Sequence, residues 1–261
     1  MSTRRQPLEN LRKTRTTNAG LWLDKFIREQ AREDKESRWA LVREVAEIRV
    51  PEDYAHWFAR WRQTLQEYGA ECREAEVQGR MVIGLGEESV LETSVALHHT
   101  YGVPYIPGSA LKGLAASFAR QHLGNDWQEN TSAYKTVFGD TQTAGYVTFF
   151  DALPFPTNSA LLHPDVITVH HEKYYQNDRT APPADWDDPN PVPFLSATGK
   201  YLIALSGPSE WVRATFDILK HALAHTGIGA KTSSGYGRLK LESALPLDLD
   251  QAKADRLIAS I

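Results

Sequence analysis

The sequence predicts an α+β fold built on the element order βαββαβ. From about residue 72 onward, patterns typical of strands and helices follow in the order strand, helix, strand, strand, helix, strand. This is the ferredoxin-like arrangement, an antiparallel sheet with two helices on one face. A Pro-, Asp- and His-rich segment interrupts the βαββαβ order, and helical patterns lie before its first strand. We therefore expect a basic tail with a helical extension at 1–70, and a ferredoxin-like domain at 71–261 with an insertion at about 151–198.

The first 18 residues are basic and polar. Five cations stand against one acid, Glu9. This composition is typical of a disordered, solvated tail. An arm that grips RNA or a partner subunit is the alternative interpretation. The cations are Arg4, Arg5, Arg12, Lys13 and Arg15.

Residues 20–68 carry three helical patterns. The third follows Pro51, which suits a first helical position. Its large apolar side chains recur at helical spacing, which is more typical of a packed core than of a ligand site. The first two patterns are LWLDKFIREQ and RWALVREVAEI, and the apolar stripe of the third is Tyr54, Trp57, Phe58, Trp61 and Leu65.

The remaining elements follow in order along the chain. EAEVQGRMVIGLG predicts the first strand, ending at Gly84 and Gly86, and AGYVTFFDALP predicts the second. Between them, Ser109 can cap a helix whose apolar face contains Leu111, Ala115 and Phe118. GKYLIALSG predicts the third strand, SEWVRATFDILKHALAHTG the second helix, and YGRLKLESAL the last strand.

Composition excludes several classes of protein. The formal net charge is −4, so any contact with nucleic acid must come from a local basic face. One cysteine, Cys72, excludes an internal disulfide framework. No apolar run approaches the roughly 20 residues of a membrane span, and the N-terminus lacks the apolar core of a signal peptide. We expect a cytoplasmic protein without a membrane partner.

The most distinctive stretch is GIGAKTSSGYGRL, residues 227–239. It is not a Walker loop, because Ala230 precedes the lysine and the loop follows a helix; it is not a dinucleotide fingerprint, because Thr232 stands where glycine is required. Glycines let backbone N–H groups approach phosphates, and cations and hydroxyls add further contacts. The predicted RNA-binding residues are Gly227, Gly229, Lys231, Thr232, Ser233, Ser234, Gly235, Gly237 and Arg238.

A second anion site is predicted in PYIPGSALKG, residues 104–113. Gly108, Ser109 and Lys112 lie at the start of a helix, where the helix dipole disfavours a cation unless an anion joins it. Arg120 lies two turns on, roughly along the same side. We include these four residues in the predicted RNA-binding site.

The pairing of PYIPGSALKG with GIGAKTSSGYGRL resembles the signature of the RAMP superfamily of CRISPR-associated proteins. Longer phrases are more specific: GLGEESVLETSVALHHTYGVPYIPGSALKG, VFGD, AGYVTFFDALP, DVITVHHEKYYQ and DWDDPNPVPFLSATGKYLIAL. Together they resemble the RAMP subunit of type III-B (Cmr) complexes that lies near the 3′ end of the guide RNA. The resemblance covers about 80–260, and residues 1–70 carry no matching motif.

The resemblance implies a non-catalytic role in antiviral defence. Such a subunit binds guide RNA, lies close to target RNA, and contacts other Cmr RAMP subunits and the small helical subunit. In that assembly, target cleavage is assigned to the repeated backbone subunit. We expect no cofactor and no metal, and the single cysteine excludes a C-x-x-C spacing.

Two alternatives remain open at this stage. One alternative is a metal-independent ribonuclease that processes guide precursors. It is suggested by side chains able to act as general acids or bases: the paired histidines at 98–99 and 170–171, with Lys173, Tyr174 and Tyr175. A protein scaffold with little RNA contact is the other alternative. A cluster of carboxylates could hold a divalent ion for RNA cleavage: Asp151, Asp165, Asp185, Asp187 and Asp188. The last three lie in a Pro-rich loop, where aspartates are more typical of turns.

Overall fold

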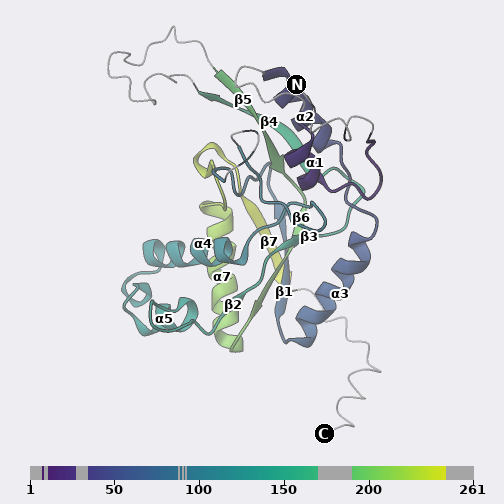
Figure 1. Ribbon diagram of the computed structural model, residues 1–261. Coiled ribbons are helices and arrows are strands. Elements are labelled where there is room, and N and C mark those ends of the chain that lie inside the picture. The colour runs from purple at the N-terminus through teal and green to yellow at the C-terminus, as the bar shows by residue number, and fades with distance from the viewer. Residues whose placement is uncertain are drawn as a thin grey trace, which may run out of the picture.

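A central antiparallel sheet organises the protein (Figure 1). The computed structural model describes residues 8, 11–27, 35–87, 89, 91, 93–169 and 190–244. Strands run in the order β2-β6-β1-β7, and β3 also pairs with β6. The predicted α+β class with an antiparallel sheet is confirmed. The strands are β1 (Glu71–Val77), β2 (Thr148–Phe149), β3 (Leu153–Pro154), β6 (Lys200–Ser206) and β7 (Leu239–Ala244).

Helices cover both faces of this sheet. Helices α4 (Gly108–His122) and α7 (Ser209–His225) lie on one side and α3 (Tyr54–Glu67) on the other (Figure 1). Side chains of a strand alternate between faces. In β6, Tyr201, Ile203 and Leu205 therefore join the core beneath α4 and α7, while Leu202 and Ala204 join the core beneath α3. The middle of β6 is buried on both faces.

The aromatic stripe predicted in the third helical pattern is part of this second core. Tyr54, Phe58 and Leu65 are buried, and Trp57 and Trp61 pack against them. Helix α3 begins at Tyr54, three residues after the predicted start at Pro51. The Pro51 carbonyl instead accepts the Tyr54 N–H in a turn at 3.1 Å.

Two strand predictions were wrong in extent. The first strand ends at Val77 and not at Gly84, because Gly79 adopts a left-handed φ of +91° and breaks the extended chain. The run AGYVTFFDALP forms two strands of two residues, β2 and β3. Between them Ala152 leaves the sheet and exchanges two backbone hydrogen bonds with Ile106, at 2.8 and 2.9 Å.

The predicted insertion contains a two-stranded antiparallel ribbon, β4 (Leu162–Val169) and β5 (Asn190–Ala197). We call it the β4–β5 ribbon. Residues 170–189, which include His170, His171, Asp185, Asp187 and Asp188, lie outside the described residues. Helices α1 (Ala19–Lys25) and α2 (Lys35–Ala46) pack together, and α2 contacts both ribbon strands. The helical extension thus shares its core with the insertion and, through α3, with the sheet.

Residues 11–17 are held against the protein by ion pairs, so the predicted disordered tail is wrong for this part. Lys13 Nζ lies 2.7 Å from Glu47 Oε2, and Arg15 Nη1 lies 2.8 Å from Glu52 Oε1. Residues 1–7 lie outside the described residues.

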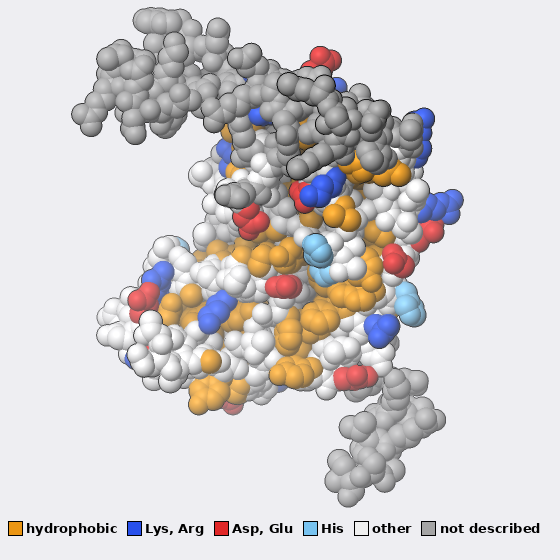
Figure 2. Space-filling model, viewed as in Figure 1, with side chains coloured by type: hydrophobic (Ala, Val, Ile, Leu, Met, Phe, Trp, Pro, Cys, Tyr) orange, Lys and Arg blue, Asp and Glu red, His pale blue; other side chains and the backbone are white. Residues whose placement is uncertain are grey.

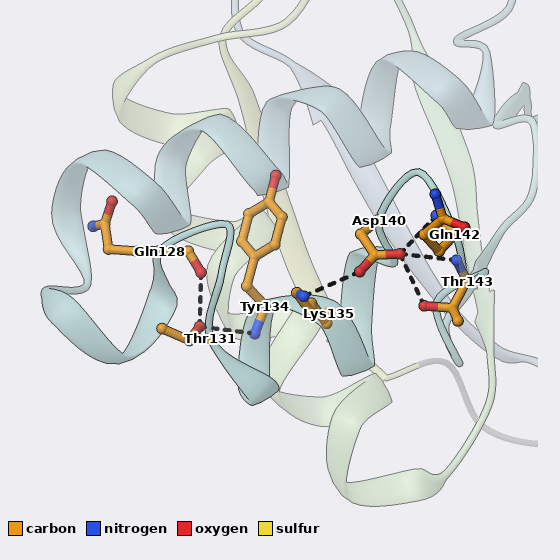
Figure 3. Close-up of polar contacts among 7 residues, drawn as sticks. All are labelled: Gln128, Thr131, Tyr134, Lys135, Asp140, Gln142 and Thr143. Atoms are coloured by element: carbon orange, nitrogen blue, oxygen red, sulfur yellow. Dashed lines mark hydrogen bonds and ion pairs between the residues drawn. The ribbon is translucent and has the colours of Figure 1, made fainter.

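The VFGD motif forms a closed turn after α5 (Ser132–Phe138), next to the short helix η2 (Asn125–Trp127) (Figure 3). Asp140 Oδ1 accepts the backbone N–H groups of Gln142 and Thr143, both at 2.8 Å, and Oδ2 lies 3.1 Å from Lys135 Nζ. These bonds, the one from Gln142 first, hold the pKa of Asp140 well below its usual range. The motif is therefore explained by local structure.

Candidate nucleic-acid interface

The glycine-rich loop, which we define as residues 227–238, connects α7 to β7 and lies against the chain that follows β1. Three backbone hydrogen bonds of 2.8 Å hold it: Ile228 N–H to Gly237 O, Gly237 N–H to Arg80 O, and Ala230 N–H to Val82 O. The loop is therefore a packed structure with a fixed position relative to the sheet.

Close packing explains most of its glycines. A Cβ on Gly237 would lie 1.9 Å from Ile228 O, and one on Gly229 would lie 2.2 Å from Val82 O. The N–H groups of Gly227, Gly235 and Gly237 already donate to carbonyls of the chain. The prediction that these N–H groups are available to phosphates is therefore corrected: the glycines allow the backbone to fold tightly. Only at Gly235 is the Cβ side open.

The tip of the loop is different, because it presents free donors. Lys231 has a left-handed φ of +59° and precedes the single turn η3 (Thr232–Ser234). Ser233 and Ser234 are exposed. Among the described residues, neither the hydroxyls of Thr232, Ser233 and Ser234 nor the backbone N–H groups of the first two have a hydrogen-bond partner.

The two cations of the loop also lack counter-ions in the described part of the chain. Neither Lys231 nor Arg238 makes an ion pair there, and Arg238 Nη1 is buried without a hydrogen-bond partner. A buried, unpaired guanidinium N–H is costly unless an anion or water satisfies it. By contrast, Lys200 and Lys240 on the sheet pair with Glu74 and Glu242, at 2.5 and 2.7 Å.

Tyr236 joins the loop to the β4–β5 ribbon. Its hydroxyl donates to Asp165 Oδ2 at 2.7 Å, and its ring lies 6.1 Å from that of Phe194. Burial and the Asp165 carboxylate raise the pKa of Tyr236 to about 12. Of the two roles open to this tyrosine, packing and stacking on a base, the described contacts are those of packing.

The predicted second anion site is occupied by the chain itself. Helix α4 begins at Gly108 after Pro107, so Ser109 lies in the first turn and the prediction that it caps the helix was wrong. The Gly108 N–H donates to Asp151 Oδ1 at 2.8 Å, which supplies the anion that the helix dipole favours. Lys112 is half-buried, and Arg120 is ion-paired with Glu129.

Comparison with known proteins places this chain. The RAMP superfamily model matches residues 74–240, a range that contains every predicted RNA-binding residue. The chain is 31% identical over 245 residues to the CRISPR system Cmr subunit Cmr6 of Pyrococcus furiosus, covering 71% of this chain and 72% of that protein.

The chain belongs to the RAMP superfamily, in its Cmr6 family. It is also 30% identical over 103 residues to Cmr6 of Saccharolobus solfataricus, covering 38% of this chain and 34% of that protein. A chain in the cryo-EM structure of the Type III-B Cmr-β bound to cognate target RNA shares the fold, with a TM-score of 0.62 at 24% identity. The match covers 79% of this chain and 72% of that chain.

The sheet of this RAMP protein does not offer the aromatic surface by which many ferredoxin-like modules stack RNA bases. Part of the face is covered by α3. By strand register, the rest of that face on β1, β6 and β7 carries five charged side chains, three of them acidic. They are Glu74, Glu76, Lys200, Lys240 and Glu242. This mixed charge does not fit an RNA backbone, so the loop is the better candidate.

Of the histidines predicted as candidates, the described pair is His98 and His99. His98 packs between Trp57 and Tyr101, with ring centroids at 5.2 and 5.6 Å, and burial lowers its pKa. His99 is exposed.

Among the described residues no group of three His, Cys, Asp or Glu side chains could hold a metal ion. In the same part of the chain, no helix has the length and apolar character needed to cross a membrane.

Sequence reasoning missed two residues beside the loop, Arg80 and His163. Arg80 was hidden inside a predicted strand, and His163 at the base of the β4–β5 ribbon lay in the predicted insertion. His163 Nε2 lies 2.9 Å from Thr198 Oγ1, and burial together with the Arg80 charge lowers the pKa of its imidazole. The sequence signal that pointed to Arg80 was its position directly after Gly79, where the chain turns.

Proposed function

We propose that this protein is a guide-RNA-binding, non-catalytic structural subunit of a type III-B Cmr complex, positioned near the 3′ end of the guide. The Cmr6 family membership supports a place in such a complex. The related fold in a Type III-B complex bound to target RNA supports proximity to RNA. Other Cmr RAMP subunits and the small helical subunit are its proposed protein partners.

The sheet topology supports a ferredoxin-like RAMP core. Along the chain the order is β1, α4, β2, β6, α7, β7, and across the sheet it is β2-β6-β1-β7. This is a βαββαβ arrangement with the first and third core strands adjacent at the centre. It places the glycine-rich loop between the second helix and the last strand, next to the end of the first strand.

One observation carries the proposal: Lys231 and Arg238 lack internal counter-ions in the described structure, beside a loop tip with free donors. Phosphodiester oxygens supply the missing acceptors and charge. Since phosphate contacts carry little sequence information, sequence selection in this proposal belongs to pairing between guide and target.

The test compares two pairs of cations in the full-length chain, alone and in the reconstituted complex. Lys231→Ala with Arg238→Ala should weaken binding of guide RNA about a hundredfold, because two charge-assisted contacts are lost, each worth about tenfold. The slope of log affinity against log salt should fall by about 1.4, or about 0.7 for each lost contact with single-stranded RNA. Lys200→Ala with Lys240→Ala removes two cations already paired with glutamates and is the matched control. Unchanged RNA affinity and complex assembly in the loop variant would refute the proposal.

A scaffold with little RNA contact is favoured by a different observation. Half-exposed aromatic side chains of α3 and the β2–β3 region pack at the edge of the second core, among them Trp57, Trp61 and Phe150, and Tyr68 is 69% exposed. Figure 2 shows hydrophobic side chains gathered on the face that carries α4 and α3. Aromatic side chains of this kind are enriched at protein interfaces. Crosslinking in the assembled complex decides: RNA adducts on residues 231–238 contradict a scaffold, and their absence contradicts RNA binding by the loop.

A further inference from the structure

Arg80 lies where three parts of the molecule meet: the end of β1, the glycine-rich loop and the β4–β5 ribbon. Its carbonyl accepts the Gly237 N–H at 2.8 Å, and two residues earlier Gln78 N–H donates to Arg238 O at 2.7 Å. The chain segments that carry Arg80 and Arg238 are therefore hydrogen-bonded side by side. Their backbone positions are fixed without any contribution from the two guanidinium groups.

The side chain of Arg80 acts on groups of both neighbours. Its positive charge lowers the pKa of His163 on the ribbon, after the larger effect of burial, and opposes the rise in the pKa of Tyr236 on the loop. The one carboxylate of the described ribbon strands, Asp165, is already bonded to the Tyr236 hydroxyl at 2.7 Å and to the Val166 N–H at 2.9 Å. Within the described residues, the Arg80 guanidinium has no hydrogen bond or ion pair.

Another half-buried arginine of the sheet shows what the chain does when a guanidinium has a structural role. Arg73 bonds Glu71 twice, at 2.8 and 2.9 Å, and lies over the ring of Phe216 at 4.2 Å. Arg80 and Arg238 are also half-buried and have no such partners in the described structure. Two unpaired guanidinium groups on adjacent segments create a positive field that a phosphodiester would neutralise, and the planar fork of arginine suits its two oxygens.

We propose that Arg80 is a further RNA-binding residue, which together with Arg238 holds a backbone phosphate in the angle between the glycine-rich loop and the β4–β5 ribbon. The inference rests on the proposed function and adds the direction in which the RNA runs across the protein. RNA that contacts Lys231 at the loop tip continues past Arg80 toward the base of the ribbon.

The experiment measures RNA affinity of the full-length chain over a series of salt concentrations. Arg80→Gln keeps the length and polarity of the side chain and removes its charge, so affinity should fall about tenfold, as expected for one charge-assisted contact. The salt slope should fall by about 0.7. Arg80→Lys should restore the slope and only part of the affinity, because lysine binds phosphate as a point charge. Arg60→Gln, an exposed arginine on α3, is the matched control and should change neither quantity.

The outcomes separate this inference from the proposed function. If the Lys231 and Arg238 double variant weakens RNA binding while Arg80→Gln leaves affinity and salt slope as in the wild type, the inference is wrong and the proposed function stands. If neither variant changes RNA binding, both are wrong. Loss of affinity in Arg80→Gln without a change in salt slope would indicate a structural role and would also overturn the inference. If the glutamine variant folds poorly, Arg80→Lys replaces it: RNA affinity equal to that of the wild type would overturn the inference, because lysine cannot reproduce the forked contact of arginine with phosphate.

Discussion

The start of α4 and the glycine-rich loop carry similar residues in different surroundings. Each combines glycine, a hydroxyl and lysine within a few positions, and each was predicted to hold an anion. At α4 the chain supplies its own anion, Asp151, to the Gly108 N–H. At the loop, Lys231 and Arg238 have no counter-ion among the described residues. The composition of a motif therefore says less about its ligand than whether the fold has already neutralised it.

The largest expected effect tests whether glycine at the start of α4 serves packing. A Cβ on Gly108 would lie 2.2 Å from Phe149 O, so Gly108→Ala should destabilise the protein by about 3 kcal/mol, as overpacking against backbone does. Gly113, in the same helix, has open space and serves as the control. Gly113→Ala should stabilise by about 0.5–1 kcal/mol, because alanine is the better helix former. Chemical denaturation measures both, and equal stability of the two variants would contradict the packing role.

A smaller effect tests whether Asp151 closes the α4 site. Asp151→Ala removes the acceptor at the helix start and should cost about 1 kcal/mol of unfolding free energy. RNA affinity should stay as in the wild type. A large gain in RNA affinity would break the comparison, because it would show that the start of α4 binds phosphate once its own carboxylate is gone.

The pH dependence of the VFGD turn sharpens the same contrast between internal and external partners. The pKa of Asp140 is lowered by bonds within the turn, so its carboxylate stabilises the fold above the ordinary aspartate pKa of about 4. That contribution is lost as pH falls through the lower folded value. The difference in unfolding free energy between wild type and Asp140→Asn should be constant from pH 5 to 8 and shrink below about 4. A difference that does not change with pH would show that these bonds act without the charge.

Periodicity was enough to find α3, α4 and α7, because one helix face depends on local spacing, but the shorter α5 was not predicted. The stripe of Tyr54, Phe58 and Leu65 is an example. Strand limits failed where distant partners decide them: Ala152 leaves the sheet to bond Ile106, 46 residues earlier in the sequence, which no local pattern shows.

For the candidate site too, local features could be predicted from the sequence and features that depend on distant residues could not. The loop tip was visible as glycine, hydroxyl and lysine, and its position between α7 and β7 was predicted correctly. The state of its charges was not visible, because polar contacts join residues that are far apart in the sequence, as the hydrogen bond from the Gly108 N–H to Asp151 shows over 43 positions. Arg80 was missed for the same reason, since its importance comes from what surrounds it.

Two prolines in β5 have a consequence for assembly. Pro191 and Pro193 face Thr168 and Val166 in the ribbon register and have no N–H to donate. Because β4 still pairs with β5, the missing donors fall on the outer edge of the ribbon. A strand from another molecule that approached this edge would find acceptors without matching donors. These two positions therefore oppose backbone pairing with a strand of another molecule, and with it the growth of a continuous sheet from one copy into the next along this edge.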